Sequence, residues 1–379
     1  MNIRSATEGF FRSGKRATPT ASVPQTDSKT KESKFSFGLY GLITSLLLGS
    51  VAGINWLIDP LWYSHGNILT GKNFAFNERI TKTNLFLRTN EQEKYDCIIL
   101  GSSRVTALRA SEFSDRNCFN YALKGAEIPD LVSYSNFLKE QGVEPEVVYV
   151  GIDGFNFVEK ERKEQPPISI ANLQTQSPLQ AYFSADVLLF SAMTLLGVSP
   201  DPGGYYDADF EPVDFDNPPV YSGQFYKPAY KQKCDLAAVE TYASLREFFP
   251  DAKYVAYVPP RSAWSVVNDT YGRNLMDCYF TAFHSLSQSY DAMYDFSIPS
   301  TVTKNSDNTF DGSHFSVETN NKIAKILQGE DDSFGVRVDN YSFADYRETY
   351  RRELRDFLAE NQELKRWDDN SEISIEMVN

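Results

Sequence analysis

The sequence is short of the residues from which metal centres are built. Its 379 residues include only three His and four Cys, and no two Cys form a Cys-x-x-Cys pair. Because zinc sites draw on clusters of these two residue types, we expect no metal centre and no cofactor. Any catalysis by histidine must use one of His65, His284 and His314.

Positive charge is also scarce. The chain has 37 Lys and Arg against 51 Asp and Glu, which gives a formal net charge of −14. A protein with this balance repels phosphate backbones, so we expect no nucleic-acid partner. Disorder of the whole chain is not indicated, since 41 % of its residues are apolar and 14 % are aromatic. The length exceeds that of a typical single domain and falls short of three.

Charge is absent altogether from one segment near the N-terminus. Residues 1–34 are polar, with seven Lys or Arg and three acidic residues, and we expect a disordered tail there. Residues 35–58 then run for 24 positions without a charge. At a rise of about 1.5 Å per residue, a helix of this length crosses a bilayer core of roughly 30 Å. We interpret it as an uncleaved transmembrane anchor, with Trp56, Trp62 and Tyr63 at the far membrane interface.

Two other interpretations of residues 35–58 are a buried core helix and a cleaved signal peptide. The basic flank and the missing charges argue against the first, and a long charged region without a following A-x-A site argues against the second. Basic flanks stay on the cytoplasmic side of a membrane. We therefore expect a single-pass inner-membrane protein of a Gram-negative cell. Its N-terminus would be cytoplasmic, and its C-terminal domain, with a net charge of −18, would be periplasmic.

The periplasm is oxidising, so the four Cys can pair there. Cys97 and Cys118 open adjacent strand candidates, whereas Cys234 and Cys278 lie at or in helices that flank another strand. We expect at least one pair within bridging distance, with Cα atoms about 4.4–6.8 Å apart. The sequence does not fix the connectivity.

Beyond a mostly helical connector at 59–94, short apolar segments alternate with amphipathic ones. This alternation predicts a parallel sheet with right-handed crossovers, covered by helices as a three-layer α/β/α sandwich. We assign this domain to residues 95–330, and a charged, solvated helix to the C-terminal tail at 331–379. The expected strands are 97–100, 118–123, 146–153, 253–260 and 292–297, and the expected helices are 128–138, 236–249, 273–290 and 317–327, with one more starting near Ser103.

An insertion at about 158–230 interrupts the alternation. Its first part predicts one or two helices, whereas 201–230 is rich in Pro, Gly, Asp and Tyr and has no period. A loop this long inside a domain is usually functional or disordered. The aromatic content favours an ordered lid or substrate wall, and a solvated insertion is the alternative.

Polar residues follow several strands, at the edge where parallel sheets gather functional groups. GSSR at 101–104 follows the first strand, and DGSH at 311–314 precedes the last helix of the domain. A serine becomes a nucleophile when a histidine removes its proton and a carboxylate holds the imidazole in the right tautomer. A strand-to-helix turn would also aim helix N–H groups at a developing oxyanion. The two motifs, in this order, predict a Ser-His-Asp triad.

Further segments accompany these two motifs along the chain. In chain order the set is Asp59-Pro60, IILGSSR at 98–104, NYALKGA at 120–126, VVYVGID at 147–153, VPP at 258–260 and DGSH at 311–314. Together they resemble the SGNH (GDSL-type) hydrolase superfamily, and more closely its membrane-anchored envelope branch. That branch includes the alginate O-acetylation proteins and the D-alanine transfer protein of teichoic acid synthesis. The resemblance covers about residues 55–330 and implies an α/β/α sandwich with a serine nucleophile after the first strand.

Position by position, the resemblance implies a role for each matching residue. Ser103 matches the nucleophile, His314 the base and Asp311 the acid that orients the base. The backbone N–H groups of Gly125 and Ser103 match two donors of the oxyanion hole. Structural roles are the alternatives, because Ser102 or Ser103 could cap a helix, Asp311 could form a turn and His314 could be a satisfied structural residue.

One block departs from the family pattern. The family usually has G-x-N-D after the third strand, and the Asn side chain is the third oxyanion donor. Here the strand ends in GIDGFN, which places Asp153 at about the Asn position, and an ionised Asp cannot donate a hydrogen bond. Asn156 is the candidate substitute. Arg104 and Asp153 are candidate substrate-binding residues, although Asp153 could instead cap a helix or pair with Arg104.

The resemblance implies a membrane-anchored periplasmic serine esterase or O-acyltransferase that acts on an envelope or exported polysaccharide through an acyl-enzyme. Its partners would be an acylated glycan or acyl donor, the membrane, and a membrane-bound acyltransferase that passes acyl groups. A catalytically impaired binding or assembly subunit of a polysaccharide modification system is the main alternative, because the G-x-N-D block is incomplete. An esterase directed at lipids is a third, although the insertion lacks an obviously apolar pair of lid helices.

Overall fold

A computed structural model describes residues 29–74, 76–159, 177–198, 205–214, 219–226 and 230–361 of the chain. The chain divides into a small unit, Met1–Gly49, and a large unit, Ser50–Asn379. Helix α1 (Lys29–Ile58) begins in the first and ends in the second. Within it, Phe37–Ile58 is long and apolar enough to cross a membrane, as the sequence predicts. The orientation across a membrane stays a prediction. Of the tail expected to be disordered at 1–34, residues 29–34 are instead helical, as the first turns of α1, and 1–28 lie outside the described residues.

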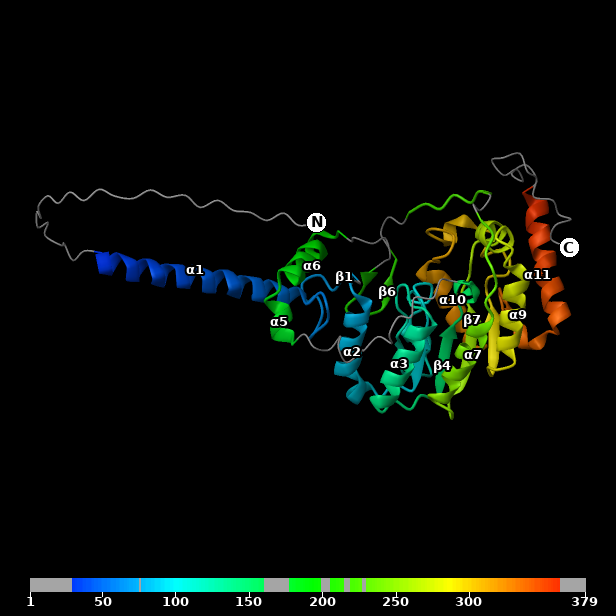
Figure 1. The fold of residues 1–379 in the computed structure, drawn as a ribbon, viewed down its shortest axis with the longest axis horizontal. Coiled ribbons are helices and arrows are strands. Elements are labelled where there is room, and N and C mark those ends of the chain that lie inside the picture. Colours follow the sequence, from blue (N-terminus) through cyan, green and yellow to red (C-terminus); the bar gives the residue numbers. More distant parts are fainter. Residues whose placement is uncertain are drawn as a thin grey trace, which may run out of the picture. The chain divides into compact units, whose positions relative to one another are not determined.

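The centre of the large unit is a six-stranded sheet (Figure 1). Five of its strands run parallel and one edge strand is antiparallel to its neighbour, so the predicted α/β class with a mostly parallel sheet is confirmed. Strands such as CIIL at 97–100 are apolar on both faces because helices cover both sides. In spatial order the strands are β3 (Cys118–Asn120), β2 (Cys97–Leu100), β4 (Val147–Gly151), β7 (Lys253–Val258), β8 (Ala292–Asp295) and β9 (Val336–Arg337).

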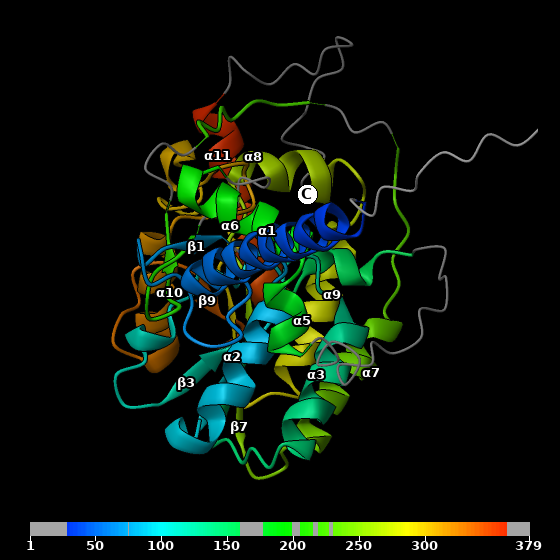
Figure 2. The same ribbon diagram turned by 90° about the vertical axis from the view of Figure 1, so that its left-hand side faces the viewer.

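Alternate strand residues enter two separate cores, which produces the three layers. Ile98 and Val148 pack in the core that also contains the buried side chains of α3 (Ile128–Glu140), α7 (Ala237–Ser244) and α9 (Met276–Ser287). Their sequence neighbours Ile99 and Val147 pack in the opposite core with α10 (Val317–Gln328). Figure 2 shows α10 to the left of the strands, and α3, α7 and α9 to the right.

The expectation of a solvated C-terminal helix is wrong. Helix α11 (Phe343–Glu360) buries one side against the same core as α9, and β9 adds an edge strand to the sheet. The helical spacing of the apolar residues in this segment was hard to recognise in the sequence, because many charged residues, which lie on the outer face of the helix, stand between them. The domain therefore extends well beyond residue 330. The buried residues of α11, at helical spacing, are Tyr346, Tyr350, Leu354, Phe357 and Leu358.

The connector and the insertion meet in a small antiparallel sheet. Strand β1 (Asn73–Phe74) pairs with β5 (Tyr205–Tyr206), which pairs with β6 (Pro212–Val213). Trp62, which we expected at a membrane interface, is instead buried against Phe210. The described helices of this region are α2 (Glu78–Glu93), α5 (Pro178–Tyr182) and α6 (Ala185–Leu196), in agreement with a helical connector and with one or two helices early in the insertion.

Two disulfides tie neighbouring elements together, which confirms the expectation of at least one bridged pair. Cys97 and Cys118 are opposite residues of the paired strands β2 and β3, with Cα atoms 4.2 Å apart. Cys234 bridges to Cys278 in α9, with Cα atoms 5.6 Å apart. Closing such loops stabilises the fold mainly by restricting the unfolded chain.

Candidate functional site

The site lies at the carboxyl end of β2, where the chain turns sharply after Leu100. Gly101 is required at this turn, because a Cβ there would approach a methyl group of Val105 to 2.5 Å. The predicted helix near Ser103 does not form. A succession of hydrogen-bonded turns takes its place, in which the Val105 N–H donates to the Ser102 carbonyl over 3.0 Å. In the described segment after β2, residues 101–108 therefore offer no helix N-terminus whose N–H groups could face Ser103.

A residue from the neighbouring strand holds these turns in place. The side-chain amide of Asn120, at the end of β3, donates to the carbonyls of Val105 (3.1 Å) and Leu108 (2.6 Å). The Val105 carbonyl also accepts the Leu108 N–H over 3.0 Å, so the bonds from Asn120 fasten a hydrogen-bonded turn at 105–108. Ser102 is buried, and its hydroxyl oxygen accepts the Arg104 N–H over 3.3 Å. Because no helix follows, neither serine is a helix cap: Ser102 closes the turn, and the Ser103 hydroxyl makes another contact.

Ser103, His314 and Asp311 form a hydrogen-bonded chain. The Ser103 Oγ lies 2.9 Å from Nε2 of His314, although the two residues are 211 positions apart in sequence. The other ring nitrogen, Nδ1, lies 2.7 Å from Oδ2 of Asp311. This is the order of contacts in which a carboxylate fixes the tautomer of an imidazole that faces a serine hydroxyl. The structure therefore brings together the three residues that the sequence singled out for this role.

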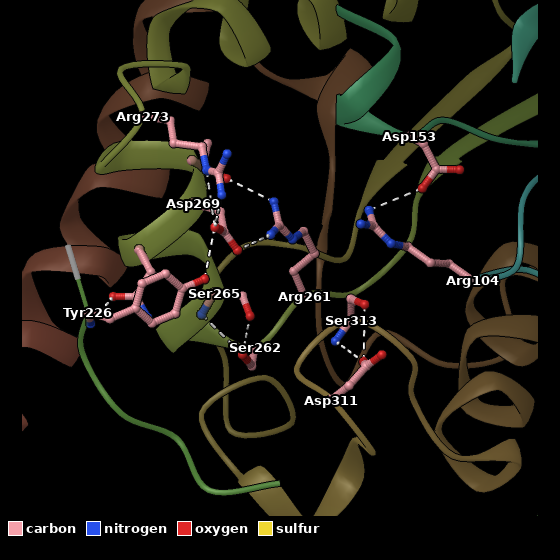
Figure 3. Close-up of polar contacts among 12 residues, drawn as sticks. Arg104, Asp153, Tyr226, Arg261, Ser262, Ser265, Asp269, Arg273, Asp311 and Ser313 are labelled. Carbon is pink, nitrogen blue, oxygen red and sulfur yellow. Dashed lines mark hydrogen bonds and ion pairs between the residues drawn. The ribbon is translucent and has the colours of Figure 1, made fainter. Parts of the chain in front are cut away.

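Asp311 is held firmly in its orientation. Its Oδ1 accepts the Ser313 N–H over 2.8 Å and the Ser313 hydroxyl over 3.1 Å (Figure 3), and it also accepts the His314 N–H over 2.8 Å. Partial burial raises the pKa of the Asp311 carboxyl, but the hydrogen bonds and charge of His314 outweigh it and lower that pKa overall. Asp311 is consequently ionised at neutral pH. The side chains of His314 and Asp311 are 39 % and 52 % exposed, so a bulky substrate can reach them.

The loop that carries Asp311 and His314 is fixed to the end of β7. The Ser262 N–H donates to the Gly312 carbonyl over 2.8 Å, and the Thr309 hydroxyl donates to the His314 carbonyl over 2.8 Å. Gly312 has a φ of +85°, and a Cβ there would lie 2.6 Å from Oγ of Ser265. Only glycine fits both restrictions. The glycine in DGSH thus allows the base and its orienting acid to sit close to the sheet.

Two backbone N–H groups are available as oxyanion donors. Among the described residues, no hydrogen bond uses the N–H of Ser103 or that of Gly125. The segment that leads to Gly125 continues alongside the end of β2, because the Leu123 N–H donates to the Gly101 carbonyl over 3.0 Å. Gly125 itself is exposed and has a φ of +65°. The topology thus brings Gly125 to the same edge of the sheet as Ser103.

Asp153 and Asn156 make contacts elsewhere. Asp153 is buried, and its Oδ1 lies 3.1 Å from Nη1 of Arg104 (Figure 3). It therefore occupies the ion-pair role that we considered for it, and it can act on a substrate only through Arg104. The Asn156 side-chain amide donates to the Tyr242 hydroxyl over 2.9 Å, and no described hydrogen bond joins it to Ser103 or His314. A third oxyanion donor is not among these contacts.

The site contains a pair of arginines, of which the sequence analysis named only Arg104. Arg261 follows β7, and its guanidinium lies beside that of Arg104 in Figure 3. Burial lowers the pKa of Arg104, the Asp153 carboxylate opposes this, and Arg261 lowers it further. Asp269 pairs with Arg261 over 3.2 Å and with Arg273 over 3.2 Å. The signal for Arg261 was its place after a strand, whereas nothing local marks Asp269 as its partner.

The insertion supplies another residue that the sequence did not single out. The Tyr221 hydroxyl lies 3.1 Å from Oγ of Ser262, and a Cβ on Gly312 would lie 2.8 Å from its ring. The Asp214 carboxylate accepts the Val317 N–H at the start of α10, just beyond His314. These contacts are those of an ordered wall beside the loop at 311–314. The rest of the insertion, at 160–176, 199–204, 215–218 and 227–229, lies outside the described residues.

The chain has a distant structural likeness to a known protein. No protein-family model matches the chain, and no curated protein matches it. One solved structure that is similar is a carbohydrate esterase family 2 enzyme with a carbohydrate-binding domain, from Corynascus thermopiles (Myceliophthora fergusii). The TM-score is 0.31 at 11 % identity, and the match covers 62 % of this chain and 65 % of that one. Because so distant a likeness carries no information on the reaction, a function for this chain must come from its own site.

Proposed function

We propose that the protein is a membrane-anchored serine esterase or O-acyltransferase that acts on O-acylated carbohydrate through an acyl-enzyme. The observation that supports this most is the contact chain from Ser103 Oγ to His314 Nε2 (2.9 Å) and from His314 Nδ1 to Asp311 (2.7 Å). Ser103 is the nucleophile, His314 the general base and acid, and Asp311 the group that orients the imidazole.

The first half of the reaction forms the acyl-enzyme. Ser103 Oγ attacks the carbonyl carbon of the ester while His314 Nε2 takes the hydroxyl proton, which leaves a tetrahedral oxyanion. The free N–H groups of Ser103 and Gly125 are the proposed donors to that oxyanion. The intermediate collapses as the bond to the leaving sugar oxygen breaks, and His314 returns its proton to that oxygen. Asp311 stays ionised throughout and stabilises the imidazolium.

The second half distinguishes a hydrolase from a transferase. His314 removes a proton from the acceptor, whose oxygen attacks the acyl-serine carbonyl. The bond to Ser103 Oγ then breaks, and His314 returns the proton to that oxygen, which restores the free serine. With water as the acceptor the product is a free acid, and with a sugar hydroxyl it is a new ester. A membrane-bound acyltransferase is the proposed partner when the acyl group arrives from across the membrane. The same triad serves either reaction, so the acceptor alone decides which occurs.

Charge and the disulfides support the proposed location. The apolar segment Phe37–Ile58 is the proposed anchor, and the basic tail before it is the proposed cytoplasmic end. Two disulfides in the large unit support an oxidising compartment such as the periplasm. An exported or envelope polysaccharide is the acylated carbohydrate that this compartment offers.

The second candidate function is a binding or assembly subunit without catalysis. It is favoured by one observation: Asp153 is engaged with Arg104, and Asn156 with Tyr242, so neither supplies a third oxyanion donor. Such a subunit would keep the fold and would bind the acylated glycan without cleaving it.

A serine-directed probe separates the two functions. We would treat the full chain in detergent micelles with a fluorophosphonate and compare Ser103→Ala with Ser102→Ala. Labelling and hydrolysis of an aryl acetate should disappear in Ser103→Ala, whereas Ser102→Ala should retain most of both, because the Ser102 hydroxyl faces Arg104 N–H. Equal and negligible labelling of the natural sequence and both variants would support the binding subunit instead.

A further inference from the structure

Helix α6 buries hydroxyl-bearing side chains and exposes leucines, which is the reverse of the usual arrangement. Its buried side consists of Val187, Ser191 and Thr194, two of which carry hydroxyl groups. On its outer side, Leu189 is 58 % exposed and Leu196 is 76 % exposed. A helix on the surface of a protein in water normally does the opposite and turns its leucines toward the core.

The exposed apolar surface extends beyond α6. Residues 177–198 contain a single charged side chain, Asp186, at the start of that helix. Large exposed apolar patches on soluble domains are uncommon and mark sites that another apolar phase covers. We call this the α5–α6 surface, and its exposed apolar residues are Leu179, Phe183, Leu189, Leu195, Leu196 and Val198.

The α5–α6 surface is fastened to the last turns of α1. The side chain of Asn55, which is fully buried, donates to the carbonyls of Tyr182 (2.8 Å) and Ser184 (3.1 Å). Its oxygen accepts the hydroxyl of Ser191 over 3.0 Å. This contact explains why a polar residue of α6 points inward, since Ser191 binds Asn55 and leaves the leucines outside.

Asp59 adds a second connection one turn further along. Its buried carboxylate accepts the backbone N–H groups of the turn at 63–66, at distances between 2.7 and 3.0 Å. The Tyr182 hydroxyl of α5 donates to the same carboxylate over 3.3 Å. The Asp59-Pro60 motif, to which the proposed reaction assigns no role, thus shapes the chain where it leaves α1 and positions α5 beside it.

We propose that the α5–α6 surface is embedded in the lipid bilayer that α1 crosses. This proposal rests on the anchor of the proposed function. If Phe37–Ile58 spans the membrane, Asn55 and Ile58 lie at the boundary between acyl chains and headgroups, and α6, bound to Asn55, lies at the same depth. A helix that exposes leucines in this zone buries them in the acyl boundary, as interfacial helices do. The large unit is then attached at two places, which fixes its tilt over the membrane.

The composition of the surface favours lipid over a protein partner. Specific protein interfaces combine an apolar centre with aromatic, Arg and hydrogen-bonding groups. The exposed residues of α6 are mainly Leu and Ala, and the hydroxyl groups of Ser191 and Thr194 are used within the chain. A lipid bilayer needs only exposed apolar side chains to hold a surface in place, and the α5–α6 surface provides these.

The depth of introduced labels tests the proposal in the full chain. All four natural Cys are paired, so a single introduced Cys accepts a thiol-specific environment-sensitive fluorophore. We would label Leu196→Cys and Leu189→Cys in vesicles of phosphatidylcholine and phosphatidylglycerol. Thr241→Cys on α7 is the exposed control, and Leu47→Cys in α1 reports on the anchor itself. Quenching by doxyl-labelled lipid and by aqueous iodide gives the environment of each label.

The proposal expects lipid quenching at positions 189 and 196 to exceed that at 241 by about threefold, with iodide showing the reverse. Iodide access at 189 and 196 equal to that at 241, with lipid quenching at 47, would overturn it and leave the anchor intact. Labels at 189 and 196 shielded from both quenchers would also overturn it, because a second protein surface would then cover them. Lack of lipid contact at 47 would contradict the anchor. Hydrolysis of a soluble aryl acetate reports on the triad separately.

Discussion

The triad edge and the α5–α6 surface use polar side chains in opposite ways. At the triad edge, which carries Ser103, Asp311 and His314, the imidazole of His314 contacts the other two side chains, and the site remains partly open to solvent. At the α5–α6 surface, polar groups such as Ser191 are buried and leucines are outside. The first arrangement is complete within the chain and can be interpreted from the chain alone. The second leaves leucines exposed to water unless lipid covers them, so its interpretation depends on the surroundings of the chain. The two regions therefore need different kinds of test.

The largest effect is expected from Asp311→Asn at the triad edge. An amide at this position cannot hold His314 in the tautomer that accepts the Ser103 proton, so kcat for an aryl acetate should fall about 10³-fold or more. Asp307→Asn, an exposed acid on the preceding turn, is the matched control and should leave kcat unchanged. Activity within tenfold of the natural sequence in Asp311→Asn would show that the carboxylate does not orient the base.

The same carboxylate has a defined dependence on pH. Its pKa is lowered from an ordinary value of 3.8, so the unfolded state binds a proton at a higher pH than the folded state does. Its contribution to the free energy of unfolding is therefore complete above about pH 4 and is lost as the pH falls through the lowered pKa. Thermal unfolding of the natural sequence and of Asp311→Asn should differ by a constant amount at neutral pH and converge only in acid. Convergence already near pH 6 would contradict the lowered pKa.

An intermediate effect is expected from Asn55→Ala, which removes the connection between α1 and α6. The change leaves the Ser191 hydroxyl and two carbonyls without their partner, which should cost about 1–3 kcal/mol in the free energy of unfolding. Gln180→Ala, exposed on α5, is the control. Thermal unfolding in detergent micelles measures both, while kcat should stay close to natural in each. A large loss of kcat in Asn55→Ala would show that the two regions are coupled.

The smallest effect is expected from Leu196→Gln on the outer side of α6. In detergent micelles the change should alter the free energy of unfolding by no more than about 0.5 kcal/mol, because Leu196 is 76 % exposed. Val187→Ala on the buried side of the same helix should cost about 1–3 kcal/mol. Equal costs for the two variants would mean that Leu196 is covered by protein, and the contrast between the two regions would disappear.

The sequence predicted the elements whose signal is local. The apolar runs of β2, β4 and β7 bounded by polar turns were sufficient to place them, and GSSR and DGSH pointed to Ser103 and His314. Their meeting follows from topology, because the carboxyl ends of parallel strands share one edge. Predictions failed where a distant residue decides the local structure. The turns after Ser103 are held by Asn120 of the next strand, a contact that the local sequence does not reveal.

Burial was harder to predict than secondary structure. The tyrosines of α11 lie among many charges, and only their packing against α9 shows that the helix belongs to the core. In α6 the sequence gives an apolar helix but not which side faces out, since that depends on the pairing of Ser191 with Asn55. The Arg104–Asp153 pair was one of several alternatives, and the structure selects it.

The most direct test of the central claim is to trap the acyl-enzyme. The full chain would be mixed with an aryl acetate, quenched in acid within the first turnover and analysed by peptide mass spectrometry. The proposed mechanism predicts one acetyl group on the peptide that contains Ser103, its absence from Ser103→Ala, and its accumulation in His314→Gln to a much smaller extent. Hydrolysis that proceeds at the natural rate with no acetyl group on Ser103, or with the group on another residue, would contradict it.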